Sequence, residues 1–231
     1  VDRSGALNLD ELQKSMRPDT AIVSVMYANN ETGVIFPIEQ IGRIVKSRGS
    51  MFHVDAVQAV GKIPIDLSKS SIDLLSLSGH KLHAPKGVGV LYIRRGTMIR
   101  PFIIGGHQER GRRAGTENIA SICALGKAAE LAHKNIADEN NIVRKMRDRL
   151  EKGLLESIPY TFVNGDTVNR LPNTTNISFE YIEGESILLL LDQHGICASS
   201  GSACTSGSLQ PSHVLRSMGV PFTAAHGSVR F

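Results

Sequence analysis

The first half of this 231-residue chain alternates short apolar runs with helical stretches. Residues 21–26 (AIVSVM), 51–55 (MFHVD), 72–77 (IDLLSL) and 87–93 (GVGVLYI) have the length and apolar content of buried strands. Between the first two runs, isoleucine and valine recur at helical spacing over residues 38–45. Strands separated by helices form a mainly parallel sheet with crossover connections. The pattern therefore predicts an α/β fold for this part of the chain.

The pattern changes from about residue 119 onward. The predicted elements there are helices over residues 120–134 and 138–157, a strand over 175–179 and an apolar helix over 186–191. Long helices followed by a strand and a helix are typical of a smaller α+β domain. We therefore expect a large domain over residues 1–134 and a smaller C-terminal domain over residues 135–231.

Composition narrows the classes of partner. The chain has 26 Lys and Arg residues against 22 Asp and Glu, and a basic excess this small argues against a nucleic-acid partner. No apolar run approaches the roughly 20 residues needed to cross a bilayer, so we expect no membrane partner. The three cysteines are odd in number and lack CxxC spacing, which argues against a disulfide framework and a structural zinc site. A reducing, cytoplasmic setting is the simplest interpretation.

The two ends of the chain indicate an internal piece of a longer protein. Val1 is not an initiator methionine, and the strand-like residues 227–231 run directly to the last position. We therefore expect the full protein to have further residues on both sides of this stretch.

Polar side chains gather where the predicted strands end. Asn30, Asp55, Ser78, His80 and Lys81 lie at or just after three different strand ends. Ligands of open α/β sheets bind beyond the carboxyl ends of the strands, so these residues can converge on one pocket. Taken singly they have plainer interpretations, because an aspartate often caps a helix or makes a turn and a histidine is often a satisfied core residue.

A lysine and a cysteine stand out by their surroundings. Lys81 follows Ser-Gly-His at a strand end, and Cys204 lies within the small-residue segment SSGSACTSGS at 199–208. An amine that holds a cofactor aldehyde, together with a thiolate on a loop of small residues, equips a protein to remove sulfur from an amino acid. The plainer alternatives are a surface lysine and a flexible linker. Cys123 and Cys197 sit in apolar stretches, and we expect them to be inert core residues.

Five motifs in order resemble the cysteine desulfurases, which are class-V enzymes dependent on pyridoxal 5'-phosphate (PLP). The motifs are NNETG at 29–33, HVDAVQ at 53–58, SGHK at 78–81, ERGRRAGT at 109–116 and SGSACTS at 200–206. The resemblance covers essentially the whole chain, and residues 211–228 look most like the NifS branch linked to nitrogen fixation. It implies the aspartate-aminotransferase fold (fold type I), with a partial large PLP-binding domain and a partial smaller α+β domain.

The resemblance also assigns residues around the PLP ring. It implies that Lys81 binds the cofactor as a Schiff base and moves the proton at the substrate Cα. Asp55 would pair with the pyridinium nitrogen and keep it protonated. Gln58 and Asn30 would hydrogen-bond the phenolic oxygen of the ring, and Asn30 would also lie beside the substrate.

The remaining assignments concern the phosphate and the substrate carboxylate. Ser78 and His80 would hold the phosphate, and Thr116 would reach the phosphate of the neighbouring subunit in a homodimer. Arg230 would clamp the substrate carboxylate with its planar pair of donors. Read without the resemblance, the three arginines of 109–116 form a solvated basic loop or a nucleic-acid patch, and Arg230 forms a structural ion pair.

The implied reaction turns L-cysteine into L-alanine and leaves a persulfide on Cys204. An iron–sulfur scaffold protein of the NifU or IscU type would take up the sulfur, and Cys204 would also meet iron during the transfer. Two alternatives stay open. One is a selenocysteine lyase or an aminotransferase of the same fold, although an aminotransferase needs no thiol. The other is a non-catalytic sulfur carrier or scaffold-binding module.

Overall fold

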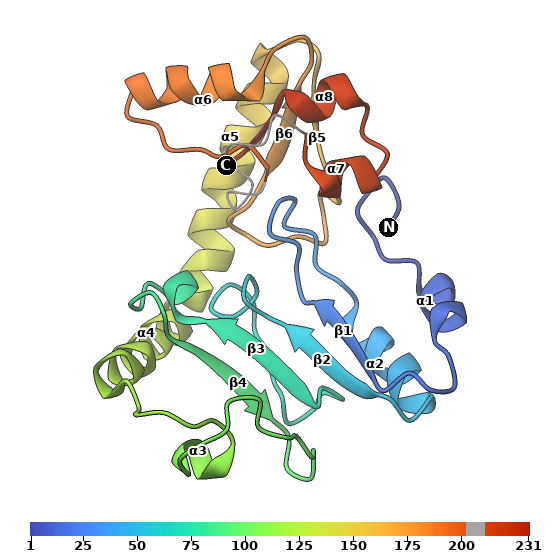
Figure 1. Ribbon diagram of the computed structural model, residues 1–231. Helices are drawn as coiled ribbons and strands as arrows, with labels where there is room; N and C mark the ends of the chain where they lie inside the picture. Colours follow the sequence, from blue (N-terminus) through green and yellow to red (C-terminus); the bar gives the residue numbers. More distant parts are fainter. Residues whose placement is uncertain (202–210) are drawn as a thin grey trace.

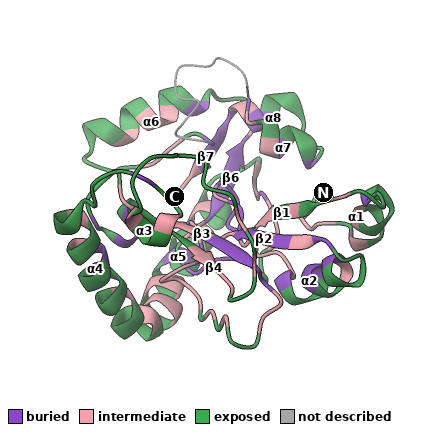
Figure 2. Ribbon diagram, turned by 60° about the horizontal axis from the view of Figure 1, so that its bottom comes forward, coloured by how far each residue is buried: buried purple, intermediate pink, exposed green. Residues whose placement is uncertain are grey.

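Two β-sheets connected by a long helical rod form the framework of the chain (Figure 1). The structure is a computed structural model and describes residues 1–201 and 211–231. Buried residues concentrate in the strands β2, β3, β6 and β7, whereas α4 and α6 are largely exposed (Figure 2). None of the helices within the described ranges has both the length and the apolar character of a membrane span.

The larger sheet has the strand order β1-β2-β3-β4. Its strands are β1 Ile22–Met26, β2 Met51–Asp55, β3 Leu74–Ser78 and β4 Gly89–Ile93. The first three are parallel, as the alternating pattern predicts, and β4 is antiparallel to β3. Only residues 79–88 join β3 to β4, which is too short for a parallel crossover, so the chain turns back along the same edge.

Helix α2, Ile38–Ser47, covers the larger sheet through its apolar stripe. Ile41 and Val45 belong to one buried cluster with Phe52 and Val54 of β2. Burial of a large aliphatic side chain stabilises a fold by about 1.5–3 kcal/mol, so this stripe fixes the sheet on which the site depends. The shorter helix α1, Leu9–Ser15, begins at Asn8, whose side chain caps it.

The two helices predicted over residues 120–134 and 138–157 form one rod, and the predicted break is wrong. Helix α4, Ile119–Asp138, continues through the π-helical η2, Glu139–Val143, into α5, Arg144–Ser157. The residues between the two predicted helices include no glycine or proline, so nothing in the backbone ends the first helix. Residue 134, our expected domain boundary, lies within α4.

The smaller sheet is antiparallel with the order β5-β6-β7. Its strands are β5 Thr161–Val163, β6 Asn176–Phe179 and β7 Ser228–Arg230. Its helices are α6 Gly184–Gln193, α7 His213–Ser217 and α8 Phe222–His226. Ile177 and Val229 form its buried centre, and α5 crosses beside it in Figure 1.

A buried ion pair attaches α5 to the segment that precedes β6. The two terminal guanidinium nitrogens of Arg170 donate to Glu151, at 2.6 and 2.7 Å, and the Thr175 hydroxyl donates to the same carboxylate at 2.5 Å. Burial alone would raise the pKa of Glu151, but the hydrogen bonds from Arg170 and Thr175 outweigh it and hold that pKa below its usual range.

Glu151→Gln is expected to destabilise the protein by about 3 kcal/mol at neutral pH, since it leaves a buried guanidinium without its charge partner. A depressed carboxyl pKa contributes stability above the unfolded-state pKa of about 4.3, and this contribution is lost as the pH falls through the folded-state value. The difference in unfolding free energy between the wild type and Glu151→Gln should therefore shrink at acidic pH. Urea unfolding across a pH series measures it, with the exposed Glu156→Gln as the control. A deficit that does not change with pH would contradict the assignment.

Candidate active site

The carboxyl ends of the three parallel strands meet at one edge of the larger sheet. Met26 of β1 pairs with Asp55 of β2, and Asp55 pairs with Ser76 of β3. The loops after these strands therefore start side by side. The smaller sheet reaches the same edge, because a guanidinium nitrogen of Arg230 in β7 donates to the Asn30 carbonyl at 2.7 Å.

A hollow of about 330 Å³ opens at this junction. Five residues singled out from the sequence line it: Asn30, Gln58, His80, Lys81 and Arg230. The remaining lining residues are Val57, Lys62, His83, Asn173, Thr174 and Phe231. Asn30 and Arg230, which lie 200 positions apart, thus share one space with polar walls.

The hollow has a cationic lining. Lys62, Lys81 and Arg230 contribute side chains, and no described residue that lines it is acidic. The Lys62 ammonium is 2.6 Å from the Glu139 carboxylate, so most of its charge is compensated. Within the described ranges, Lys81 and Arg230 form no salt bridge. The arrangement suits a ligand that carries phosphate or carboxylate groups.

A tight turn presents Lys81 to the hollow. The 3₁₀ helix η1, Gly79–Leu82, follows β3 directly. The Gly79 amide donates to the Val88 carbonyl at 2.8 Å, and a Cβ at position 79 would lie 2.8–2.9 Å from two Val88 atoms. Only glycine therefore lets the chain turn so sharply after β3. The turn ends at His83, which has a left-handed backbone with φ of 64°.

Asp55 and Ser78 lie at strand ends next to the hollow but are not among its lining residues. Asp55 Oδ1 accepts a hydrogen bond from the Val57 amide at 2.9 Å, which shapes the turn after β2. The Ser78 hydroxyl is 2.7 Å from Nδ1 of His80, which orients that ring. Each residue thus positions a neighbour that reaches the hollow.

Thr116 is a further predicted site residue that does not line the hollow. It is exposed and follows α3, Gln108–Gly111, in the sequence. Its assignment to a neighbouring subunit stays a prediction. Cys204 lies outside the described residues, and so does its expected contact with iron. Among residues 1–201 and 211–231, no group of three or more His, Cys, Asp or Glu side chains is arranged to hold a metal ion.

The expectation that Cys123 and Cys197 are core residues is wrong. Both are free and exposed. Helix α4 buries only Leu125 and Ala128, and Cys123 occupies an outward face among apolar neighbours that are exposed as well. Cys197 lies in the exposed stretch after α6. Apolar neighbours in the sequence do not establish burial where a helix has only one covered face.

Sequence reasoning missed the part of the small-sheet wall that lies next to Arg230. Asn173 and Thr174 come from the loop before β6, and buried Arg147 on α5 fixes that loop by donating to the carbonyls of Leu171 and Thr174 at 2.8 and 3.1 Å. Read singly, these residues look like ordinary turn formers. Lys62 and His83 were missed too, although their nearness to the motifs at 53–58 and 78–81 was a usable signal.

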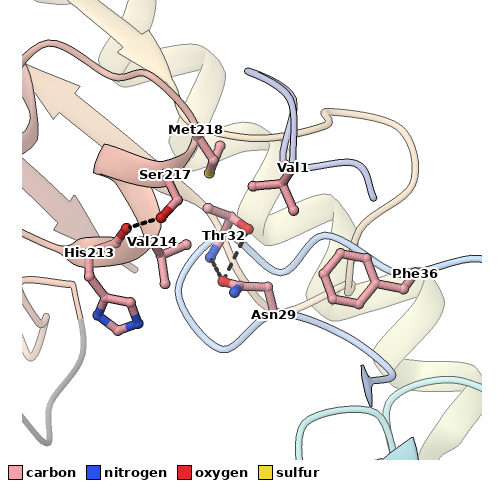
Figure 3. Close-up of a pocket in the computed structure, with 9 residues that line it drawn as sticks. Val1, Asn29, Thr32, Phe36, His213, Val214, Ser217 and Met218 are labelled. Atoms are coloured by element: carbon pink, nitrogen blue, oxygen red, sulfur yellow. Dashed lines mark hydrogen bonds between the residues drawn. The ribbon is translucent and has the colours of Figure 1, made fainter. Parts of the chain in front are cut away.

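A second hollow, of about 160 Å³, lies between the N-terminal residues, the loop after β1 and α7 (Figure 3). Its labelled polar groups largely satisfy one another: Asn29 accepts from the Thr32 amide and hydroxyl, and Ser217 donates to the His213 carbonyl. None of the site residues predicted from the sequence lines it. The larger hollow is therefore the candidate active site.

Comparison with known proteins agrees with the motifs. The family model for class-V aminotransferases matches residues 1–231. The chain belongs to the class-V aminotransferase family. The family match confirms the α/β fold expected from the sequence.

Among class-V relatives, cysteine desulfurase NifS of Azotobacter vinelandii is 65% identical over 231 residues, which are 100% of this chain and 58% of that protein. A solved NifS-like protein superposes with a TM-score of 0.90 at 41% identity, covering 100% of this chain and 60% of that one. The structure of SspA in complex with cysteine gives 0.83 at 33% identity, with 99% and 63% covered. The chain is thus similar to cysteine desulfurases and spans about three fifths of their length.

Proposed function

We propose that the protein is a PLP-dependent cysteine desulfurase, which converts L-cysteine to L-alanine and leaves a persulfide on Cys204. The observation that carries the proposal is the meeting of Lys81, Asn30 and Arg230 in one cationic hollow. The similarity to NifS of Azotobacter vinelandii and to SspA, which was solved with cysteine, supports this choice of substrate.

The residues around the hollow fit PLP. Lys81 supplies an amine for the aldehyde, and Gln58 and Asn30 supply amide donors for the ring oxygen. His80, oriented by Ser78, supplies a ring nitrogen for the phosphate. Asp55 supplies a carboxylate at the end of β2 for the pyridinium nitrogen. When bound, PLP supplies an electron sink for the bonds at the substrate Cα.

The chain's own residues then have separable tasks. Arg230 binds the substrate carboxylate, and its existing bond to the Asn30 carbonyl fixes the direction of the guanidinium plane. Lys81 would take the proton from the substrate Cα. The cationic lining attracts the substrate carboxylate into the hollow.

Sulfur transfer needs no external oxidant. The thiolate of Cys204 attacks the substrate sulfur, a sulfur–sulfur bond forms, and the Cβ–S bond breaks with its electron pair left on carbon. The carbon takes up a proton and leaves as the methyl group of alanine, so one thiol and one cysteine give one persulfide and one alanine. We propose that a cytoplasmic iron–sulfur scaffold accepts this sulfur, in nitrogenase maturation, and that the enzyme acts as a homodimer.

The proposal is tested with the protein expressed from its complete coding sequence. Incubation with PLP and L-cysteine should give alanine and, with a reductant, sulfide in equal amounts. A faster reaction with selenocysteine alone would indicate a selenocysteine lyase, and amino transfer to a keto acid would indicate an aminotransferase. Absence of a visible PLP band would leave only the sulfur carrier.

Arg230→Gln is expected to raise the KM for L-cysteine by about 10- to 100-fold, because hydrogen bonds to a charged group contribute about 1.5–3 kcal/mol. Steady-state alanine formation measures it. The exposed Arg216→Gln on α7 is the matched control and should leave the KM unchanged. An unchanged KM in the Arg230 variant would remove this residue from the substrate site.

A further inference from the structure

Glu31 is a buried carboxylate for which the proposed reaction has no role. It is 0% exposed and lies in the turn after β1, where its amide donates to Asn29 Oδ1 at 2.8 Å. Its Oε2 accepts from the Ser212 hydroxyl at 2.5 Å. Among the described residues no cation forms a salt bridge with it, and Oε1 has no hydrogen-bond partner. A buried charge with so little compensation is costly, which indicates a role beyond packing.

The carboxylate contacts both flanks of the segment that contains Cys204. Ser212 is the N-cap of α7 and accepts from the amides of Val214 and Leu215, so its hydroxyl hydrogen is directed at Glu31. Gly201 lies against the same group, because a Cβ there would be 3.1 Å from Glu31 Oε2 and 3.2 Å from the Ser212 Cβ. One buried carboxylate thus binds Ser212 by a hydrogen bond and lies close to Gly201.

The same contacts continue to the hollow. The backbone of Ser199 and that of Arg230 exchange two hydrogen bonds, of 2.7 and 3.1 Å. Arg230 donates to the carbonyl of Asn30, the residue next to Glu31. Two routes therefore connect Glu31 to the segment near 199–201, one through the chain and Arg230 and one through its own side chain.

We propose that Glu31 is a positioning residue for sulfur transfer: its carboxylate holds Gly201 and Ser212 beside the Arg230 side of the hollow. The inference rests on the proposed cysteine desulfurase function. It assigns to Glu31 no contact with substrate or PLP, so Glu31 should affect the transfer step and not the binding of either molecule.

The test compares Glu31→Ala, Ser212→Ala and the double variant in the protein expressed from its complete coding sequence. The kcat for alanine formation should fall about tenfold in each single variant, the effect of losing a hydrogen bond to a charged group. The KM for cysteine and the visible PLP absorption should stay within about twofold. Because both changes remove one contact, the double variant should be no slower than the slower single variant.

Glu31→Gln keeps the side-chain volume and one acceptor oxygen, so it serves if the alanine variant fails to fold. It weakens the Ser212 bond by removing the charge, and the kcat should fall about fivefold with an unchanged KM. Glu185→Ala, an exposed acid on α6, is the control. Multiplying effects in the double variant, a raised KM, or full activity would overturn the inference. An inactive wild type would instead refute the proposed function.

Discussion

Cys204→Ala is expected to abolish sulfur release from L-cysteine while PLP remains bound. The variant removes the nucleophile, and loss of a nucleophile lowers turnover by about a thousandfold or more. The visible PLP band should persist, since the residues that fit PLP lie around the hollow at the strand ends. Alanine and sulfide formation are measured together with the absorption spectrum.

The two other cysteines provide sharp controls because both are exposed and free. Exposed thiols can accept sulfur as a persulfide, so a result that finds no sulfur on these two cysteines is informative. Cys123→Ala and Cys197→Ala should keep full turnover, and mass spectrometry after reaction with cysteine should find the added sulfur on Cys204. Added sulfur on Cys123 or Cys197 with retained activity in Cys204→Ala would contradict the proposal.

Lys81→Ala is expected to remove the covalent attachment of PLP and to lower turnover by about a thousandfold or more. The reason is that Lys81 is the amine in the hollow with no carboxylate partner among the described residues. Borohydride reduction of the wild type followed by peptide mapping should find the pyridoxyl group on Lys81.

Lys62 makes this mapping a strict test, because its side chain lines the same hollow. Its ammonium already pairs with the Glu139 carboxylate at 2.6 Å, whereas Lys81 has no such partner among the described residues. The exposed Lys86 is the matched control, and Lys86→Ala should leave PLP attachment intact. A pyridoxyl group on Lys62 or Lys86 would contradict the assignment of Lys81.

Local patterns in the sequence predict the larger sheet well. The run at 51–55 coincides with β2, and the spacing of Ile41 and Val45 matches the buried stripe of α2. The reversal of β4 and the joining of α4 to α5 were not predicted. The reversal of β4 depends on the short connection between β3 and β4. The joining of α4 to α5 depends on the absence of a helix breaker from the residues between the two predicted helices. Neither appears as a change of hydrophobic period.

The candidate site likewise contains residues that local motifs predict and residues that only distant contacts position. The motifs at strand ends identify Lys81, His80, Gln58 and Asn30, because each of these residues closely follows the strand that positions it. The loop that contains Asn173 is held by Arg147 of α5, which donates to the carbonyls of Leu171 and Thr174, and no local pattern in the sequence indicates these contacts. The Glu31–Ser212 bond joins residues 181 positions apart and is likewise invisible to local patterns.

The hollow takes its amine from the larger sheet and its guanidinium from the smaller one. An amino acid that engages both Lys81 and Arg230 therefore spans the junction, and its binding free energy is linked to how the two sheets dock. Bound ligand should therefore stabilise the docked arrangement of the two sheets. We expect saturating cysteine analogues to raise the unfolding temperature of both sheets together. By the same linkage, a substitution at the junction changes substrate affinity without touching the ligand.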